Sequence, residues 1–181
     1  MNASARADDA AGQLPETIRG ERELDELLSR PGEAAVAALG RLEGDLLVLG
    51  VAGKMGPTLA RMAVRASQAA GVARRVIGVA RFSDPAVRGR LEGWGVQTLQ
   101  ADLLDRRQLE RLPDAPNVLF LAGMKFGSSG QEALTWAMNC YVPALVCERF
   151  ARSRIAAFST GNVYGLVPAG GEGSKETDPP E

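Results

Sequence analysis

Histidine is absent from this chain of 181 residues, and cysteine occurs only twice. Without histidine, nucleophilic catalysis by a Ser-His-Asp or Cys-His arrangement is excluded, and no metal site of the zinc type is expected. Cys140 and Cys147 lie seven residues apart on one expected helix, which separates them by roughly 10 Å along its axis. That distance is too long for a disulfide within one helix. We therefore expect two thiols in the protein core, in a reducing compartment.

Long apolar runs and an excess of one charge are missing as well. No segment is long enough to span a bilayer, and residues 1–20 lack the apolar stretch of a signal peptide. The formal net charge of −1 gives no general attraction to nucleic acid or to a membrane surface. The composition, 45% hydrophobic and 24% charged, is that of an ordinary globular domain. We expect a cytoplasmic protein that binds neither nucleic acid nor membrane.

The most informative feature present is a glycine-rich turn between an apolar run and a helical pattern. Residues 46–49 are consecutive apolar residues, which is typical of a strand buried on both faces. A helix is expected over 57–70, with Pro57 in the first turn, where its missing N–H has no intrahelical partner. The segment between the two, 50–56, carries three glycines.

These glycines have the spacing G-x-x-G-x-x-G, which predicts a dinucleotide-binding turn. We assign Gly50 to the tight turn, Gly53 to the close approach of a phosphate, and Gly56 to the packing of the helix on the strand. Unpaired N–H groups and the dipole at the start of the helix attract an anion. We therefore expect the pyrophosphate of a dinucleotide to bind here, with Lys54 and Met55 in the same site.

Strand and helix patterns alternate along the rest of the chain. Further strands are expected over 75–80, 96–100, 117–123 and 154–160, with helices between them, the longest over 133–151 with a bend at Pro143. Five alternations predict an α/β fold, a Rossmann-type doubly wound parallel sheet with the strand order 3-2-1-4-5. In such folds ligands bind at the carboxyl ends of the strands.

The chain before the first strand is expected to be an addition to this fold. Residues 1–20 lack periodicity and are interpreted as a mobile leader. Residues 21–44 are expected to form an N-terminal helical extension that covers either a sheet edge or the adenine side. Residues 45–181 are expected to form the dinucleotide-binding domain, incomplete at its carboxyl end, and 165–181 is rich in glycine, proline and acid, as in a loop.

The end of the second strand indicates which dinucleotide binds. An acidic residue there bonds the ribose hydroxyls of NAD, whereas an arginine favours the extra phosphate of NADP. The chain has Arg81 and no acid before Asp84, so NADP is favoured, with Arg81 on the phosphate and Ser83 assisting. The alternative is that Arg81 is a solvated surface residue. After the third strand, Asp102 either accepts a hydrogen bond from the adenine amino group, with Leu103 against the ring, or caps the next helix.

Several motifs, in order, resemble the extended short-chain dehydrogenase/reductase superfamily, in particular the NAD-dependent epimerase/dehydratase family. The resemblance runs from residue 45 to the end and rests on GVAGKMG (50–56), ADL (101–103), LAG (121–123), MN (138–139) and FSTGNVYG (158–165). It implies NAD(P) as cofactor and hydride transfer at a hydroxyl-bearing carbon of a small substrate, commonly a nucleotide sugar.

The resemblance also implies further site residues. Thr160 matches the family's catalytic hydroxyl, and Ser159 lies beside it. Ala122 and Gly123 match the turn that lines the ribose side of the cofactor. Asn139 matches a helix asparagine of the proton relay, or else it is a polar residue satisfied inside a helix interface.

Two departures from the family pattern matter for the reaction. Dehydratases carry an Asp-Glu pair after the hydroxyl, but this chain has Gly161 and Asn162, which argues against that elimination. Neither Tyr141 nor Tyr164 is followed by a lysine four places on, so the Y-x-x-x-K proton donor is missing. The chain therefore looks like the amino-terminal part of a longer enzyme. The alternative is a non-catalytic NAD(P)-sensing or regulatory module.

Two minor expectations complete the interpretation. Lys125 either reaches substrate or phosphate, or is solvated. Because relatives dimerise partly through the helix expected over 133–151, the resemblance also implies a homodimer.

Overall fold

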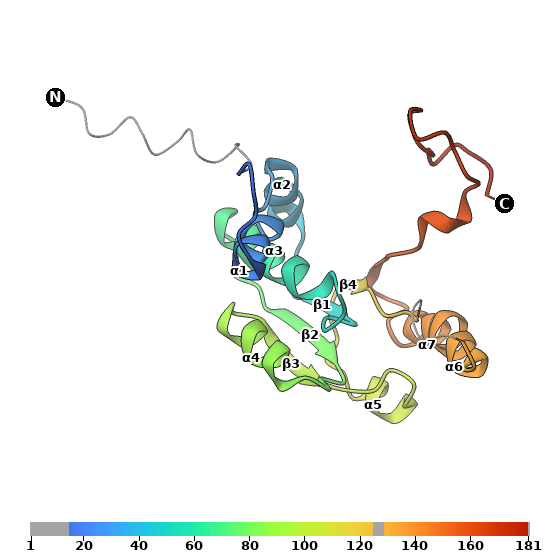
Figure 1. Ribbon diagram of the computed structural model, residues 1–181. Coiled ribbons are helices and arrows are strands. Elements are labelled where there is room, and N and C mark those ends of the chain that lie inside the picture. Colours follow the sequence, from blue (N-terminus) through green and yellow to red (C-terminus); the bar gives the residue numbers. More distant parts are fainter. Residues whose placement is uncertain (1–14, 125–128, 181) are drawn as a thin grey trace.

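A five-stranded parallel sheet lies at the centre of the protein (Figure 1). It is seen in a computed structural model that describes residues 15–124 and 129–180. The strands are β1 (Leu46–Leu49), β2 (Val76–Ala80), β3 (Gln97–Gln100), β4 (Asn117–Phe120) and β5 (Arg154–Ala157). They pair in the order β3-β2-β1-β4-β5, and every pair is parallel. The expected Rossmann-type fold and its strand order are confirmed.

Helices cover both faces of this sheet. They are α3 (Gly56–Ala69), α4 (Pro85–Gly93), α5 (Arg106–Glu110), α6 (Glu132–Trp136) and α7 (Val142–Arg149). Leu46 and Val48 of β1 join one core cluster with residues of α3 and α4. Leu47 and Leu49 join a second cluster with residues of α5 and α7. Successive side chains of β1 therefore enter opposite cores, as in a strand covered by helices on both sides.

The helix expected over 133–151 is interrupted. α6 ends at Trp136, and a π-helical turn, Ala137–Tyr141, separates it from α7. The amide of Val142 donates to the carbonyl oxygen of Ala137, five residues back. Pro143 follows at the start of α7 and, having no N–H, cannot donate to a carbonyl oxygen of the π-helical turn before it. The interruption therefore lies just before the proline.

Both cysteines lie on the outer side of this helical segment. Cys140 and Cys147 are exposed and free, so the expectation of core thiols is wrong. The buried stripe passes through Val142, Leu145 and Val146 instead. Positions 140 and 147 fall outside that stripe, because a helix buries only the side that faces the sheet.

Two short helices precede the sheet and pack on α3. They are α1 (Glu21–Leu28) and α2 (Glu33–Arg41), and both contact α3 (Figure 1). Arg74 joins α2 to the chain before β2, because its guanidinium donates to the carbonyl oxygens of Leu39 and Leu42, each at 2.6 Å. The contacts thus lie at neither place suggested by the sequence, a sheet edge or the adenine side. Residues 1–14 of the expected leader lie outside the described residues.

Beyond β5 the chain has little regular structure. A 3-10 turn, Gly161–Val163, precedes a segment that contains neither helix nor strand through residue 180. This segment points away from the sheet (Figure 1), and the loop expected after residue 165 is confirmed to that point. Within the described ranges, no helix combines the length and apolarity needed to cross a bilayer.

Gly56→Ala tests the close packing of α3 on the end of β1. A Cβ added at Gly56 would lie 2.2 Å from the Val51 carbonyl oxygen. Because that neighbour is backbone, it cannot move aside as a flexible side chain would. We expect the variant to lose about 2–3 kcal/mol of unfolding free energy, measured by urea denaturation.

Gly89→Ala is the matched control within α4. Nothing lies within 4 Å of a Cβ added at Gly89, and alanine is a better helix former than glycine by up to about 1 kcal/mol. We expect this variant to be at least as stable as the natural chain. An equal loss of stability in both variants would contradict the packing argument.

Candidate functional site

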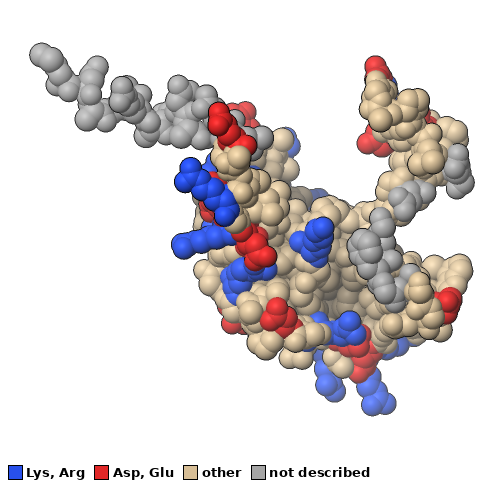
Figure 2. Space-filling view, viewed as in Figure 1, with Lys and Arg blue, Asp and Glu red and all other residues tan. Residues whose placement is uncertain are grey.

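A cleft of about 360 Å³ opens at the carboxyl ends of β1 to β4, where the surface is hollowed in Figure 2. Of the predicted cofactor residues, it brings together Gly50, Gly53, Arg81, Ser83, Asp102, Leu103, Ala122 and Gly123. Its volume is at the lower end of the range for small-ligand clefts, roughly 300–1,000 Å³. Its place at the strand ends is the one at which doubly wound sheets bind their ligands.

The turn after β1 forms one wall of this cleft. Gly50 has a φ of 84°, a left-handed conformation that glycine adopts without steric cost. A Cβ at Gly50 would lie 2.7 Å from the Ala122 amide nitrogen, so the turn lies directly against the chain after β4. The assignment of Gly50 to a tight turn is confirmed, and it also permits a close approach that the sequence did not indicate.

The backbone N–H groups available to an anion belong to residues 54–56 and not to Gly53, which was assigned to the phosphate. The N–H of Gly53 donates to the Gly50 carbonyl oxygen at 3.1 Å, so it is used within the turn. Within the described chain, the N–H groups of Lys54, Met55 and Gly56 form no hydrogen bond, and no side chain caps the start of α3. These groups are therefore the ones that can face a phosphate.

The segment after β2 contributes Arg81 and Ser83, both exposed and both on the cleft wall. Between them, Phe82 is buried and has a φ of 49°, which is rare for a bulky residue and is most often found at functional sites. Asp84 accepts a hydrogen bond from the Ala86 amide and caps α4. Sequence reasoning missed Phe82 because an aromatic residue gives no sign of a left-handed backbone.

Asp102 lies on the cleft wall and does not cap a helix. Its carboxylate accepts a hydrogen bond from the Leu104 amide at 3.0 Å, whereas Asp105 caps α5 by accepting from the Arg107 amide at 2.9 Å. A hydrogen bond from the Gln108 side chain is the main cause that lowers the pKa of Asp105. The capping alternative for Asp102 is thus wrong. Leu103 belongs to the core, is only 6% exposed, and also lines the cleft.

Asn139 fixes the chain after β4. Its Oδ1 accepts a hydrogen bond from the Met124 amide, and its Nδ2 donates to the Met124 carbonyl oxygen, both at 2.8 Å. Because Asn139 lies in the π-helical turn, these bonds tie that turn to the segment that carries Ala122 and Gly123. The neighbouring Met138 lines the cleft, although its type alone gave no signal. Lys125 lies outside the described residues.

The predicted catalytic hydroxyl does not line the cleft. Ser159 and Thr160 follow β5 and are exposed, and the carbonyl oxygen of Thr160 accepts a hydrogen bond from the Val163 amide at 3.5 Å. Since β4 separates β5 from β1 in the sheet, Thr160 lies at the same edge but beyond the cleft wall.

A larger cavity, of about 1300 Å³, lies between α1 and the helices α3 and α4. It is lined by side chains of these helices and of the chain before α1, and none of the strand ends reaches it. We therefore place the candidate dinucleotide site in the smaller cleft and consider the larger cavity separately below.

The comparisons with known proteins concern the fold. No family model and no curated protein matches the chain. Among solved structures it is similar to one titled "X-ray structure of Pen from Bacillus thuringiensis", with 14% sequence identity and a TM-score of 0.50. The match covers 60% of this chain and 34% of the other, so the chain spans about a third of the length of that protein.

Asn139→Ala tests whether the π-helical turn holds the segment after β4. The variant loses both hydrogen bonds to Met124, which together contribute about 1–2 kcal/mol. We expect the Met124 amide to exchange its hydrogen at least tenfold faster, measured by NMR-detected hydrogen exchange. Cys140→Ala, the next position on the same turn and also exposed, should leave the Met124 rate unchanged. Unaltered protection in Asn139→Ala would contradict this role.

Proposed function

We propose that this chain is the NAD(P)-binding part of an oxidoreductase of the epimerase/dehydratase type, a member of the extended short-chain dehydrogenase/reductase superfamily. The observation that carries the proposal is the cleft at the carboxyl ends of β1 to β4, with the left-handed Gly50 turn on one wall. The N–H groups of Lys54, Met55 and Gly56, which form no hydrogen bond within the described residues, follow this turn in the sequence, although these three residues do not themselves line the cleft. A diphosphate needs such a combination of close backbone approach and free donors.

Each strand end that lines the cleft would contact a different part of the dinucleotide. The pyrophosphate would lie against Lys54, Met55 and Gly56, and the adenosine would lie toward the ends of β2 and β3. There the free carboxylate oxygen of Asp102 is available to the adenine amino group. Ala122 and Gly123, held by Asn139, would face the ribose on the nicotinamide side.

Arg81 favours NADP over NAD. Its guanidinium is exposed on the cleft wall, and an arginine recognises a phosphate through charge-assisted, often paired hydrogen bonds. Ser83 lies on the same wall and can donate a further hydrogen bond. Asp84, the nearest acid, is engaged in capping α4, which leaves no carboxylate directed at the ribose hydroxyls from this segment.

The nicotinamide group would supply the hydride acceptor or donor for a hydroxyl-bearing substrate. In this role Thr160 would hold the substrate oxygen, while Asn139 would position the segment between substrate and cofactor. A nucleotide sugar is the substrate class we favour. The exposed free thiols of Cys140 and Cys147 fit a cytoplasmic location, where thiols stay reduced.

A non-catalytic NAD(P)-sensing module is the second candidate. It is favoured by the position of Thr160 outside the cleft and by the absence of a tyrosine among the residues that line it. Incubating the purified chain with NADPH and carbonyl substrates tests the sensing role, and neither candidate predicts turnover by this chain, which lacks the Y-x-x-x-K tyrosine. Turnover would contradict the sensing role and would also require a proton donor other than a Y-x-x-x-K tyrosine.

Titration of the purified chain with NADPH and NADH, followed by the reduced cofactor's fluorescence, tests the cofactor assignment. We expect Arg81→Ala to weaken NADPH binding about 10- to 100-fold, because one arginine–phosphate contact is lost. NADH affinity should change less than about twofold, since it lacks that phosphate. Arg111→Ala, an exposed arginine outside the cleft, should change neither affinity. Equal losses for both cofactors would contradict the role of Arg81, and no binding of either would contradict the site.

A further inference from the structure

α1 is attached to the protein through Asp25 and Glu26. Two of its three leucines, Leu24 and Leu28, are exposed, while Leu27 is half-buried and lines the groove beside the helix. Ser29, just after the helix, is fully buried, and Asp25 and Glu26 point toward α3 and α4. On the opposite side, Leu24 and Leu28 are 38% and 51% exposed. No residue of α1, which the structure describes in full, is buried. A helix held by core packing would bury its leucine stripe instead.

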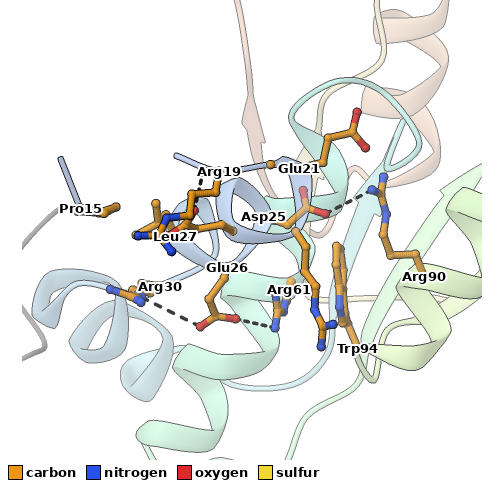
Figure 3. A pocket seen from close by; sticks show the side chains of 13 residues that line it. Pro15, Arg19, Glu21, Asp25, Glu26, Leu27, Arg30, Arg61, Arg90 and Trp94 are labelled. Atoms are coloured by element: carbon orange, nitrogen blue, oxygen red, sulfur yellow. Dashed lines mark hydrogen bonds and ion pairs between the residues drawn. The ribbon is translucent and has the colours of Figure 1, made fainter. Parts of the chain in front are cut away.

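Three arginines and one tryptophan lie beneath α1, and we call them the arginine–tryptophan face: Arg61, Arg65, Arg90 and Trp94. Figure 3 shows Arg61, Arg90 and Trp94 of this face. Glu26 accepts hydrogen bonds from Arg61 and Arg65, each at 2.7 Å. Asp25 accepts one from Arg90 at 3.2 Å.

Trp94 lies between two of these arginines. The guanidinium carbons of Arg61 and Arg90 are 4.7 and 5.4 Å from the centroid of its ring. Such cation–π contacts hold the guanidinium groups on the tryptophan without using their N–H donors. The arrangement therefore presents oriented donors to carboxylates that approach from outside, which is the geometry in which arginine binds carboxylates best.

The contact between α1 and this face is open to solvent along one side. A groove of about 1300 Å³, open to solvent, runs beside α1 and is lined by residues of α1 and of the face (Figure 3). Solvent therefore reaches the polar groups that join α1 to the face. The ion pair of Glu26 with Arg61 is partly solvated, with 36% and 21% of the side chains exposed. Pairs of this kind are weak and are screened by salt.

We propose that the arginine–tryptophan face is a binding surface for an acidic helical segment of a partner protein, and that α1 occupies it as an intramolecular substitute. The adjacent carboxylates of Asp25 and Glu26 indicate the ligand chemistry: two acids presented on one side of a helix. Because the contacts of Asp25 and Glu26 with the face are solvent-accessible ion pairs and hydrogen bonds, a partner helix with the same acids and better packing into the groove displaces α1. This surface is separate from the dinucleotide cleft.

A charge-neutralised variant of the whole chain tests the proposal. Asp25→Asn/Glu26→Gln removes both acids that pair with the face, while Glu21→Gln/Glu23→Gln removes the same number of acids from α1, neither of which forms an ion pair with an arginine of the face. Both variants also carry Trp136→Phe. Of the two tryptophans in the chain, only Trp94 then remains. Circular dichroism establishes that each variant keeps its fold.

The probe is a synthetic peptide with the sequence of residues 15–32, titrated while Trp94 fluorescence is recorded. We expect saturable binding to the Asp25→Asn/Glu26→Gln protein and at least tenfold weaker binding to the Glu21→Gln/Glu23→Gln protein, whose own α1 still occupies the face. A peptide carrying both neutral substitutions should bind at least tenfold more weakly, as should the natural peptide in 0.5 M rather than 0.05 M salt.

Equal binding of the natural and neutral peptides, or no binding to the opened variant, would overturn the proposal. Tighter binding of a single-stranded oligothymidylate than of the peptide would assign the face to nucleic acid instead. If the double variant does not fold, hydrogen exchange on the natural chain decides. Amides of α1 should then exchange at least tenfold faster in 0.5 M than in 0.05 M salt while those of α3 do not change, and a salt-independent α1 would refute a displaceable helix.

Discussion

The close approach of backbone to backbone at the end of β1 is the constraint on which the rest of the structure depends. Gly56 sits against the Val51 carbonyl, and Gly50 sits against the Ala122 amide. The first contact fixes the distance of α3 from the sheet, and the second fixes the chain after β4 beside the turn. A side chain at Gly56 would push α3 away from the sheet, and one at Gly50 would push apart two walls of the cleft, the turn after β1 and the chain after β4.

Several local hydrogen bonds hold the rest of the cleft around this close backbone contact. Bonds from the Gly50 and Val51 amides to Val79 join the turn to β2, and Asn139 holds the segment after β4 from the other side. Each of these hydrogen bonds uses backbone groups or a side-chain amide, and none of them uses a charged side chain. The charged residues that line the cleft are Arg81, Asp84 and Asp102, of which Asp84 caps α4.

The fold could be predicted from the sequence because its signals are strong and local. Residues such as Leu47 and Val48 belong to an unbroken apolar run, and only a strand between two helical layers buries such a run completely. The cleft residues near the glycines followed from the same logic, since strand ends of a parallel sheet share one edge. What could not be predicted depends on tertiary contacts.

The side of a helix that faces the protein is one such property. The leucines of α1 recur at helical spacing (24, 27 and 28), but Glu26 of the same helix pairs with Arg61 and Arg65, and Leu24 and Leu28 remain exposed. Likewise, Cys140 and Cys147 fall outside the stripe that faces the core. The left-handed Phe82 is held by its buried surroundings, and nothing in its local sequence requires that conformation. Sequence patterns thus located the helices, the strands and the carboxyl edge of the sheet. They did not locate the orientation of side chains, because contacts between distant parts of the chain decide it.

The position of β5 has a consequence for the behaviour of the chain in solution. Within the described residues β5 pairs with β4 alone, and Ala156 and Ala157 on it are exposed. One row of its backbone N–H and C=O groups therefore faces outward as a template for another extended segment. Arg154 is the one charge on this short strand, and charged side chains are a usual protection of such edges against pairing between molecules. Concentrated solutions of this chain should accordingly be handled as those of a protein with an open sheet edge.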